Sequence, residues 1–469
     1  MNALRMLVAA CIRWSAVGIL LLVLLFPAYK NLLIVYGPLL LSLGVAVYVN
    51  RRLESGWTPA AAWDRRVFFA VLLAGPALVQ VLLLVGLRPE PMYDGRFVFR
   101  EAVLLAETGR MSPLTYYPPA QTWWYAAWFK IFGASPLVAQ LSHVPLHALV
   151  SLLTYGFARR VTPGLARLAA LVVAWYPSFV GYVLTTPYYH YLYTASVVAT
   201  AWAWVVATDR PRGALAAGLA SGLGALTKAT QLIAPAQALA FWLLDAGPIQ
   251  RASRIAHPVS RIALFLVGMA VVIGPWTYRN WLVFDDLVPV CTSGGLVLHS
   301  ANNPESNGLY SGVPDLASIH TPADMLAHSR ASAETAKRFM REEPARFARL
   351  AVGKVLHTWG GEATFAELIN HRGRPLGHWE DGFSGVFYLG WVCVVGVWAG
   401  RSLVALRTRR PLHPAELALG VVLFSNAAVY AVFEGGDRHH LPIVPLIVVA
   451  ALAGAAAPAK ACEPDGSRS

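Results

Sequence analysis

Long apolar segments separated by short polar turns make up most of this chain. Segments of roughly 17 to 25 apolar residues, the length that crosses the hydrocarbon core of a bilayer, can be placed about twelve times if a few shorter ones are admitted. The pattern therefore predicts an all-α polytopic membrane protein with about 12 transmembrane helices, the seventh and eighth being short and interrupted. The predicted spans are residues 6–27, 32–49, 67–87, 137–158, 165–184, 191–207, 214–226, 232–244, 262–276, 383–400, 415–433 and 441–457.

The stretch 91–133, between the third and fourth spans, departs from this pattern. Its residues 97–110 mix apolar and charged positions in a way typical of a helix lying on the membrane surface. A Tyr-Tyr-Pro-Pro segment at 116–119 resists helix formation, and an aromatic run then precedes Lys130 at what should be headgroup level. The stretch is thus predicted to form two short amphipathic juxtamembrane helices that hold Asp94 over the bilayer.

A second hydrophilic region, roughly residues 279–381, has the Pro, Gly, Asn and Ser content of loops around a helical stretch near 323–354. No sequence repeat of fixed period is present. The predicted organisation is two N-terminal spans and a cytoplasmic loop in 1–65, a transmembrane core in 66–279 with its outer loop at 88–135, the long outer region in 280–382, C-terminal spans in 383–458 and a cytoplasmic tail in 459–469.

Composition agrees with a membrane protein. Of the 469 residues 57% are hydrophobic and 13% charged, and the mean hydropathy is +0.51, which excludes an ordinary soluble protein. The net charge of +13 is scattered over short turns, which suits topology signals and anionic headgroups and argues against nucleic-acid binding. The four cysteines lack paired spacing, so neither a disulfide framework nor a zinc site is indicated. Arg5 and Arg13 flank and interrupt the first apolar run, which is read as a membrane anchor.

The turns fall into a basic set and a nearly neutral set. Beyond Lys30, Lys228 and Arg438, the second set holds almost no basic residue, so the positive-inside rule places both termini in the cytoplasm. Asp94 and the long hydrophilic region then face outward. The basic residues on the other side are Arg51, Arg52, Arg65, Arg66, Arg159, Arg160, Arg167, Arg210, Arg212, Arg251, Arg254, Arg261, Arg401, Arg407, Arg409 and Arg410.

Ionisable residues gather at the outer ends of several spans, where such groups are costly unless paired or hydrated. These residues also have non-catalytic explanations. Asp94 could be an ordinary loop charge, and Lys228 and Arg279 could extend their charged groups to lipid headgroups. His143 and His147 are expected to hydrogen-bond neighbouring helices rather than to bind a metal. The candidates for substrate binding are Arg100, Glu101, Tyr116, Tyr117, His190, Glu434, His439 and His440.

Several motifs then occur in a recognisable order. They are the outward Asp94, the YPP segment with its short helix ending at Gly133, the string PWTYRN at 275–280 with later GG and NNP, and Arg438 before LPIVP at 441–445. From about residue 67 to 457, this order resembles the GT-C class of glycosyltransferases, and most closely the branch with protein O-mannosyltransferases and the lipid A aminoarabinose transferase.

The resemblance implies an enzyme that takes a sugar from a polyprenyl phosphate at the outer face of a membrane. It implies Asp94 as the catalytic acid-base residue and Arg279 and Arg438 near the donor phosphate, where Lys228 is assigned as a third cation. The expected location is the bacterial inner membrane, with the site facing the periplasm and a role in the cell envelope, for example on lipopolysaccharide. The expected partners are the lipid-linked sugar, a lipid, glycan or protein acceptor, and membrane lipids.

The chain also departs from that family pattern. Gly95 stands where an acidic residue often follows the Asp, Tyr116 and Tyr117 replace charged residues before the prolines, and no acid accompanies His190. The sugar, the acceptor and any divalent metal therefore stay open, and no metal ligands are assigned.

The expected chemistry needs only the residues present. Phosphate leaves as an anion of low basicity, so its departure requires cations, and one carboxylate can take the proton of the attacking hydroxyl. Attack opposite the leaving group inverts the anomeric centre. The competing hypotheses are an O-antigen-type ligase or polymerase, which works without an essential Asp in the early loop, and a lipid or glycan transporter, whose polar residues should line the bilayer midplane.

Overall fold

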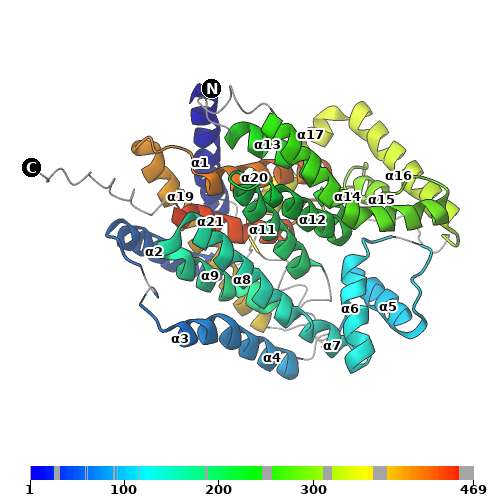
Figure 1. Cartoon of the computed structure of the whole chain (residues 1–469), viewed down its shortest axis with the longest axis horizontal. Helices are drawn as coiled ribbons and strands as arrows, with labels where there is room; N and C mark the ends of the chain where they lie inside the picture. Colours follow the sequence, from blue (N-terminus) through cyan, green and yellow to red (C-terminus); the bar gives the residue numbers. More distant parts are fainter. Residues whose placement is uncertain are drawn as a thin grey trace, which may run out of the picture.

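The computed structural model describes residues 2–25, 32–58, 60, 62–87, 90–91, 93–114, 116–184, 189–245, 256–309, 319–362 and 378–453, and every regular element within these ranges is helical. The predicted all-α class is therefore confirmed. In Figure 1 the surface helices α5 and α6 lie toward the same side of the bundle as α15 and α16, away from α2. The longer helices are α1 (Asn2–Leu25), α2 (Leu32–Glu54), α8 (His143–Val161), α11 (His190–Ala207), α12 (Arg212–Thr227), α14 (Ala256–Phe284), α19 (His378–Arg407) and α20 (Pro414–Val432).

Shorter helices complete the bundle. They are α3 (Arg65–Phe69), α4 (Gly75–Leu87), α5 (Tyr93–Thr108), α6 (Ala120–Phe132), α7 (Pro136–Leu141), α9 (Ala166–Ala174), α10 (Pro177–Gly181), α13 (Ala234–Asp245), α15 (Ser293–Ser300), α16 (Pro322–Glu342), α17 (Pro344–Trp359) and α21 (Val444–Ala453). The two predicted surface helices are thus α5 and α6, separated by the YPP segment.

The described part of each of the twelve predicted spans falls on one or more helices, but the count of twelve is not confirmed. Six helical segments in the described ranges are long and apolar enough to cross a membrane, or seven if one bent pair is a single span. Helix α12 contains 16 residues, fewer than the roughly 20 that cross a bilayer. The described parts of α13 and α21 contain 12 and 10 residues.

Two predicted elements are broken where a proline enters. The span predicted at 165–184 consists of α9 and α10, which meet at an angle of 44°. The stretch predicted near 323–354 is likewise two helices, α16 and α17, because Pro344 starts a new helix after Glu343. Proline cannot donate a backbone hydrogen bond and restricts the residue before it, which favours a break at both points.

Helix α14 differs in the opposite sense, because it continues past the predicted end at Trp276 and through Pro275 to Phe284. Thr277 Oγ1 donates to the Ile273 carbonyl at 3.0 Å, and Asn280 Nδ2 donates to the Val288 carbonyl at 3.0 Å. These bonds hold the helix and the returning chain together beyond the proline. The long outer region therefore begins after residue 284.

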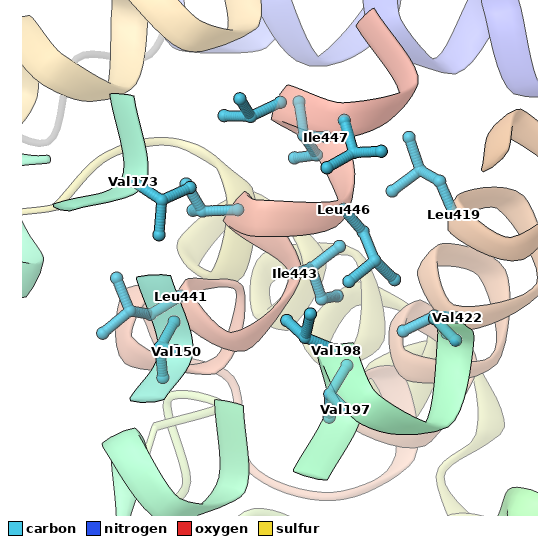
Figure 2. Packing of buried hydrophobic residues seen from close by; sticks show 14 of the residues in the cluster. Val150, Val173, Val197, Val198, Leu419, Val422, Leu441, Ile443, Leu446 and Ile447 are labelled. Atoms are coloured by element: carbon cyan, nitrogen blue, oxygen red, sulfur yellow. The ribbon is translucent and has the colours of Figure 1, made fainter. Parts of the chain in front are cut away.

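The short C-terminal helix α21 occupies the centre of the bundle, and all ten of its described residues are buried. Figure 2 shows Leu446 and Ile447 of α21 among Val150 of α8, Val173 of α9 and aliphatic side chains of α11 and α20. In a bilayer such contacts stabilise helices through close packing rather than through escape from water. The described part of α21 is thus held by neighbouring helices.

Glycines allow α12 and α14 to approach closely. A Cβ atom at Gly218 would collide with the Phe265 carbonyl, and one at Gly268 would lie 2.5 Å from the Leu215 carbonyl. Small residues at such crossings let transmembrane backbones touch. This packing fixes the end of α12, which carries Lys228.

The two N-terminal helices, whose role the sequence leaves unassigned, pack along α19. The guanidinium of Arg13 in α1 is buried and bonds both carboxylate oxygens of Glu416 in α20, at 3.2 and 3.0 Å. Arg13 also donates to the carbonyls of Arg410 and Pro411 at 2.8 and 3.1 Å. These helices therefore brace the C-terminal spans that carry Glu434 and Arg438.

The predicted orientation can be tested with cysteine labelling. Arg96 on α5 and Ser55 after α2 are both exposed in the structure. In a background without the native cysteines, an impermeant thiol reagent added outside intact cells should label Arg96→Cys and leave Ser55→Cys unlabelled. The reverse labelling would place α5 in the cytoplasm.

Candidate functional site

A pocket of about 440 Å³ brings together segments that are far apart in the sequence. Its walls come from α5 and the YPP segment, Tyr189, the break after α12, the start of α15, and the end of α20 with the turn that follows. Seven predicted site residues line it, namely Asp94, Tyr116, Tyr117, Lys228, Glu434, Arg438 and His439. The pocket also has an apolar wall formed by Leu232, Ile233, Val297, Val429 and Phe433.

Asp94 lies in the first turn of α5, where the helix dipole favours a negative charge. The Tyr117 hydroxyl donates a hydrogen bond to Asp94 Oδ1 at 2.6 Å. The ring of Tyr117 packs edge-on against Tyr116 with 4.5 Å between centroids, and the two prolines after Tyr117 lead into α6. The YPP segment thus fixes the orientation of the carboxylate within the pocket.

Lys228 ends α12 with an extended backbone, and the chain continues as a short 3₁₀ helix before α13. Its Nζ donates to the Tyr189 hydroxyl at 2.7 Å and lies 3.0 Å from His439 Nδ1. It also lies 4.6 Å from the ring centroid of Tyr189 and 5.1 Å from that of Tyr430. Burial lowers the pKa of this ammonium well below its ordinary value, and Arg438 lowers it further.

Arg438 and Glu434 form an ion pair at the pocket wall. Burial raises the pKa of the Glu434 carboxyl, but Arg438 and His439 lower it more, so its pKa falls below the ordinary value. His439 lies 3.4 Å from Glu434 through Nε2 and stacks on Tyr430 with 4.2 Å between centroids. Burial and Lys228 lower the pKa of His439 to about 3, so this ring is neutral near pH 7 and can accept the Lys228 hydrogen bond through Nδ1.

The turn after α20 has the sequence EGGDRHH at residues 434–440, and its two glycines allow it to lie against α17. A Cβ at Gly435 would lie 2.6 Å from the Lys354 Cα, and the Gly435 N–H donates to the Gly308 carbonyl at 3.1 Å. The Gly436 N–H donates to Thr358 Oγ1 at 3.3 Å. The long outer region therefore holds the turn that presents Arg438 and His439.

Two of the remaining predicted residues, His190 and His440, lie behind the pocket. His190 contacts the Tyr182 hydroxyl and stacks on Tyr189 with 4.3 Å between centroids. His440 places Nδ1 2.6 Å from the Thr358 carbonyl and Nε2 2.9 Å from Glu362 Oε1. Neither ring lines the pocket, although His190 supports Tyr189, which does.

Arg279, Arg100 and Glu101 do not line the pocket either. Arg279 donates to the Ser112 carbonyl at 2.9 Å and lies 4.9 Å from the Trp276 ring. Glu101 accepts a hydrogen bond from the Ser112 N–H at 3.2 Å, and burial raises the pKa of its carboxyl. Arg100 is exposed on α5. Arg279 and Glu101 thus tie α14 and α5 to the loop between α5 and α6, and the donor role of Arg279 stays a prediction.

Sequence reasoning missed Tyr189 and Glu362. Tyr189 adjoins the predicted His190 and was passed over, although it is the neighbour whose ring enters the pocket. Glu362 is fully buried and accepts from the Tyr176 hydroxyl at 2.5 Å and from the Ser178 hydroxyl. Only the Gly-Gly pair before Glu362 could have drawn attention to it.

Within the residues that the structure describes, no group of three or more His, Cys, Asp or Glu side chains is placed to hold an ion. The pocket itself has two carboxylates, Asp94 and Glu434, and the second is paired with Arg438. The arrangement can bind an anion beside two cations and can accept a proton at Asp94.

Lys354 provides a pH prediction for this region. Its Nζ is buried and donates to Asn302 Oδ1 at 2.7 Å and to the Val432 carbonyl at 3.1 Å, and burial lowers its pKa to about 8. In the unfolded chain the pKa returns to about 10.4, so between these values the unfolded state binds more protons and stability rises with pH. The melting temperature of the wild type minus that of Lys354→Met should therefore increase from pH 7.5 to pH 10. A constant difference would contradict a depressed pKa.

Two of three comparisons with known proteins found similar ones. A sequence model of the family Dolichyl-phosphate-mannose-protein mannosyltransferase matches residues 117–276, the part of the chain that contains Tyr117, Tyr189 and Lys228. The structure of the archaeal oligosaccharyltransferase AglB from Archaeoglobus fulgidus, in complex with an inhibitory peptide and a dolichol-phosphate, superimposes with a TM-score of 0.50 at 15% identity over 84% of this chain. The chain thus shares the fold of this oligosaccharyltransferase.

The chain spans about half the length of AglB, because the match covers 50% of that protein. A second structure of the Archaeoglobus fulgidus oligosaccharyltransferase, tethered to an acceptor peptide, gives a TM-score of 0.49 at 15% identity, covering 83% of this chain and 49% of that one. ArnT from Cupriavidus metallidurans bound to undecaprenyl phosphate gives 0.43 at 14% identity, covering 84% of this chain and 76% of ArnT. No curated protein sequence matched.

Proposed function

We propose that this chain transfers a sugar from a polyprenyl phosphate to a lipid, glycan or protein acceptor at the outer face of the membrane, with inversion at the anomeric carbon. One observation carries the proposal: a single pocket holds Asp94, Lys228 and Arg438 beside an apolar wall. The GT-C fold and the match to a family that uses dolichyl-phosphate-mannose support it.

The donor fits the two halves of the pocket. A polyprenyl phosphate has an anionic group and a long apolar chain, and the pocket offers Lys228 and Arg438 beside Leu232, Ile233 and Val429. Lys228 is held by neutral partners, Tyr189 and His439, so its charge is not cancelled by a direct carboxylate contact. An ammonium in a desolvated site stabilises a phosphate more strongly than it would in water.

The acceptor fits the side of the pocket formed by α5. In the proposed step the acceptor oxygen forms a bond to the anomeric carbon while the bond from that carbon to the phosphate oxygen breaks. Asp94 takes the hydroxyl proton, and Lys228 and Arg438 stabilise the charge that collects on the departing polyprenyl phosphate. The Tyr117 hydroxyl bond holds the carboxylate in one orientation for this transfer.

The polar residues within the spans argue against a transporter. Gln80, at the middle of α4, donates to the Phe179 carbonyl at 3.2 Å and to the Tyr191 hydroxyl at 3.2 Å. His143 in α8 contacts the Tyr125 hydroxyl at 2.5 Å. Both groups bond neighbouring helices, as predicted for His143, whereas a transporter is expected to place polar residues around a substrate site at the midplane.

The proposed function can be tested in cells that contain or lack this chain. Mass spectrometry of their envelope glycolipids and glycoproteins should show one class of molecule that loses a single sugar in the deletion and regains it when the wild-type chain is restored. Restoration with Asp94→Asn should leave the sugar missing. Identical profiles with and without the chain would contradict the proposal.

A further inference from the structure

A second cavity, of about 680 Å³, lies at the opposite ends of the helices from the candidate site. It is formed where α8 and α11 end, on the face that the arginine pattern predicts to be cytoplasmic. Nothing in the proposed sugar transfer uses this cavity. Its lining residues are Tyr155, Gly156, Arg159, Arg160, Trp202, Val206, Asp209 and Arg210.

The cavity has an excess of positive charge. Arg160 forms an ion pair with Asp209, and both side chains are largely exposed. Arg159 instead lies over the Tyr155 ring, with its guanidinium carbon 5.7 Å from the centroid, which leaves the edge of the guanidinium able to donate two hydrogen bonds. Arg210 lines the same cavity, and neither it nor Arg159 forms a salt bridge within the described part of the chain.

A glycine shapes the wall of this cavity. The Trp202 ring of α11 lies across Gly156 of α8, where a Cβ atom would stand 2.5 Å from the Trp202 ring. Trp202 and Tyr155 are each partly buried, with an apolar body and a polar edge. Aromatic residues of this kind favour the headgroup level of a bilayer.

An apolar strip leads from the cavity toward the middle of the membrane. Leu149 and Leu152 of α8 are 41% and 38% exposed. They precede Gly156 and Arg159 on one helix face, because residues three and four apart share a face. With a rise of about 1.5 Å per residue, the two leucines lie roughly 10 to 15 Å deeper than Arg159.

We propose that this cavity binds an anionic phospholipid of the cytoplasmic leaflet, with the phosphate on Arg159 and Arg210 and an acyl chain along Leu152 and Leu149. Basic pockets between transmembrane helices on this side suit such headgroups. The leucine strip favours a lipid over free phosphate, because it gives an acyl chain a place on the same helix face. The site is independent of the proposed sugar transfer.

The test is native mass spectrometry of the purified full chain titrated with phosphatidylglycerol or with phosphatidylcholine of the same acyl chains. The wild type should bind the first phosphatidylglycerol at least about 10-fold more tightly, since each basic residue near the surface contributes about a fivefold preference. The double variant Arg159→Gln/Arg210→Gln should lose this preference. The matched control Arg65→Gln/Arg407→Gln removes two exposed arginines of the same predicted face outside the cavity and should keep it.

Three results would overturn the proposal. The first is a wild type that binds the two lipids equally, and the second is a double variant that keeps the preference. The third is full displacement of phosphatidylglycerol by millimolar inorganic phosphate, which would make the cavity a site for free anions. Thermal unfolding in phosphatidylcholine checks that each variant is folded, and the single changes Arg159→Gln and Arg210→Gln give the same readout if the double variant is not.

Discussion

Purified Asp94→Asn should turn over at least about 100-fold more slowly than the wild type while it binds the donor nearly as well. The amide keeps the volume of the carboxylate and can still accept the Tyr117 hydroxyl bond, but it cannot take the proton of the acceptor hydroxyl. General bases typically contribute about 100- to 10,000-fold, and the pocket offers one other carboxylate, Glu434, which is paired with Arg438. Single-turnover transfer and donor binding, measured on the same preparation, separate the two effects.

Glu101→Gln is the matched control for this change. Glu101 lies on the same helix as Asp94 but outside the pocket, where it accepts the Ser112 N–H. We expect a small loss of turnover and a lower melting temperature. If folded Asp94→Asn transfers sugar at a rate near wild type, Asp94 is not the base, and the ligase or transporter hypothesis becomes the better account.

Lys228→Met should weaken donor binding by about 1.5 to 3 kcal/mol, the loss expected for a hydrogen bond to a charged group. Methionine fits the space between the Tyr189 and Tyr430 rings without a charge. Arg438→Met should weaken donor binding by a similar amount. It also leaves Glu434 buried without its cation and should therefore lower the melting temperature. Isothermal titration with polyprenyl phosphate measures the binding term directly.

The Lys228 effect also depends on pH. Burial lowers the pKa of the free ammonium, and a bound phosphate favours the charged form, so donor affinity should fall as pH rises through that pKa. Lys228→Arg keeps its charge and should lose this dependence.

Arg279→Met separates two roles: weaker donor binding would place Arg279 at the phosphate, and a lower melting temperature alone would agree with its bond to the Ser112 carbonyl. If donor binding is unchanged in both Lys228→Met and Arg438→Met, these residues do not bind the donor, and extension of their side chains to lipid headgroups becomes the better explanation.

The sequence predicted the parts of this fold that depend on local pattern. The surface helices α5 and α6 follow from amphipathic composition on either side of paired prolines, and the break at Lys228 follows from two short apolar runs. The number of helices that cross the membrane does not follow from local pattern. The burial of α21 on all sides depends on partners from α8, α9, α11 and α20, which no single segment reveals.

The candidate site was predictable to the extent that ionisable residues near span ends are rare. Asp94, Lys228 and Arg438 stand out in apolar surroundings, and the structure brings all three to one pocket. Arg279 has the same appearance in sequence, but its side chain bonds the Ser112 carbonyl, a contact set by the course of a distant loop. Glu362 was missed for a similar reason, because its partners Tyr176 and His440 come from other parts of the chain.

The most direct test of the central claim is to identify the lipid product made by the purified chain. The chain is incubated with a lipid extract from the cells that express it, and the polyprenyl lipids are followed by mass spectrometry. The account predicts that the wild type converts a sugar-linked polyprenyl phosphate to free polyprenyl phosphate as one acceptor gains the sugar, and that Asp94→Asn does not. Release of a polyprenyl diphosphate would indicate a ligase or polymerase, and movement of an unchanged lipid across vesicles would indicate a transporter. Either result would contradict the account.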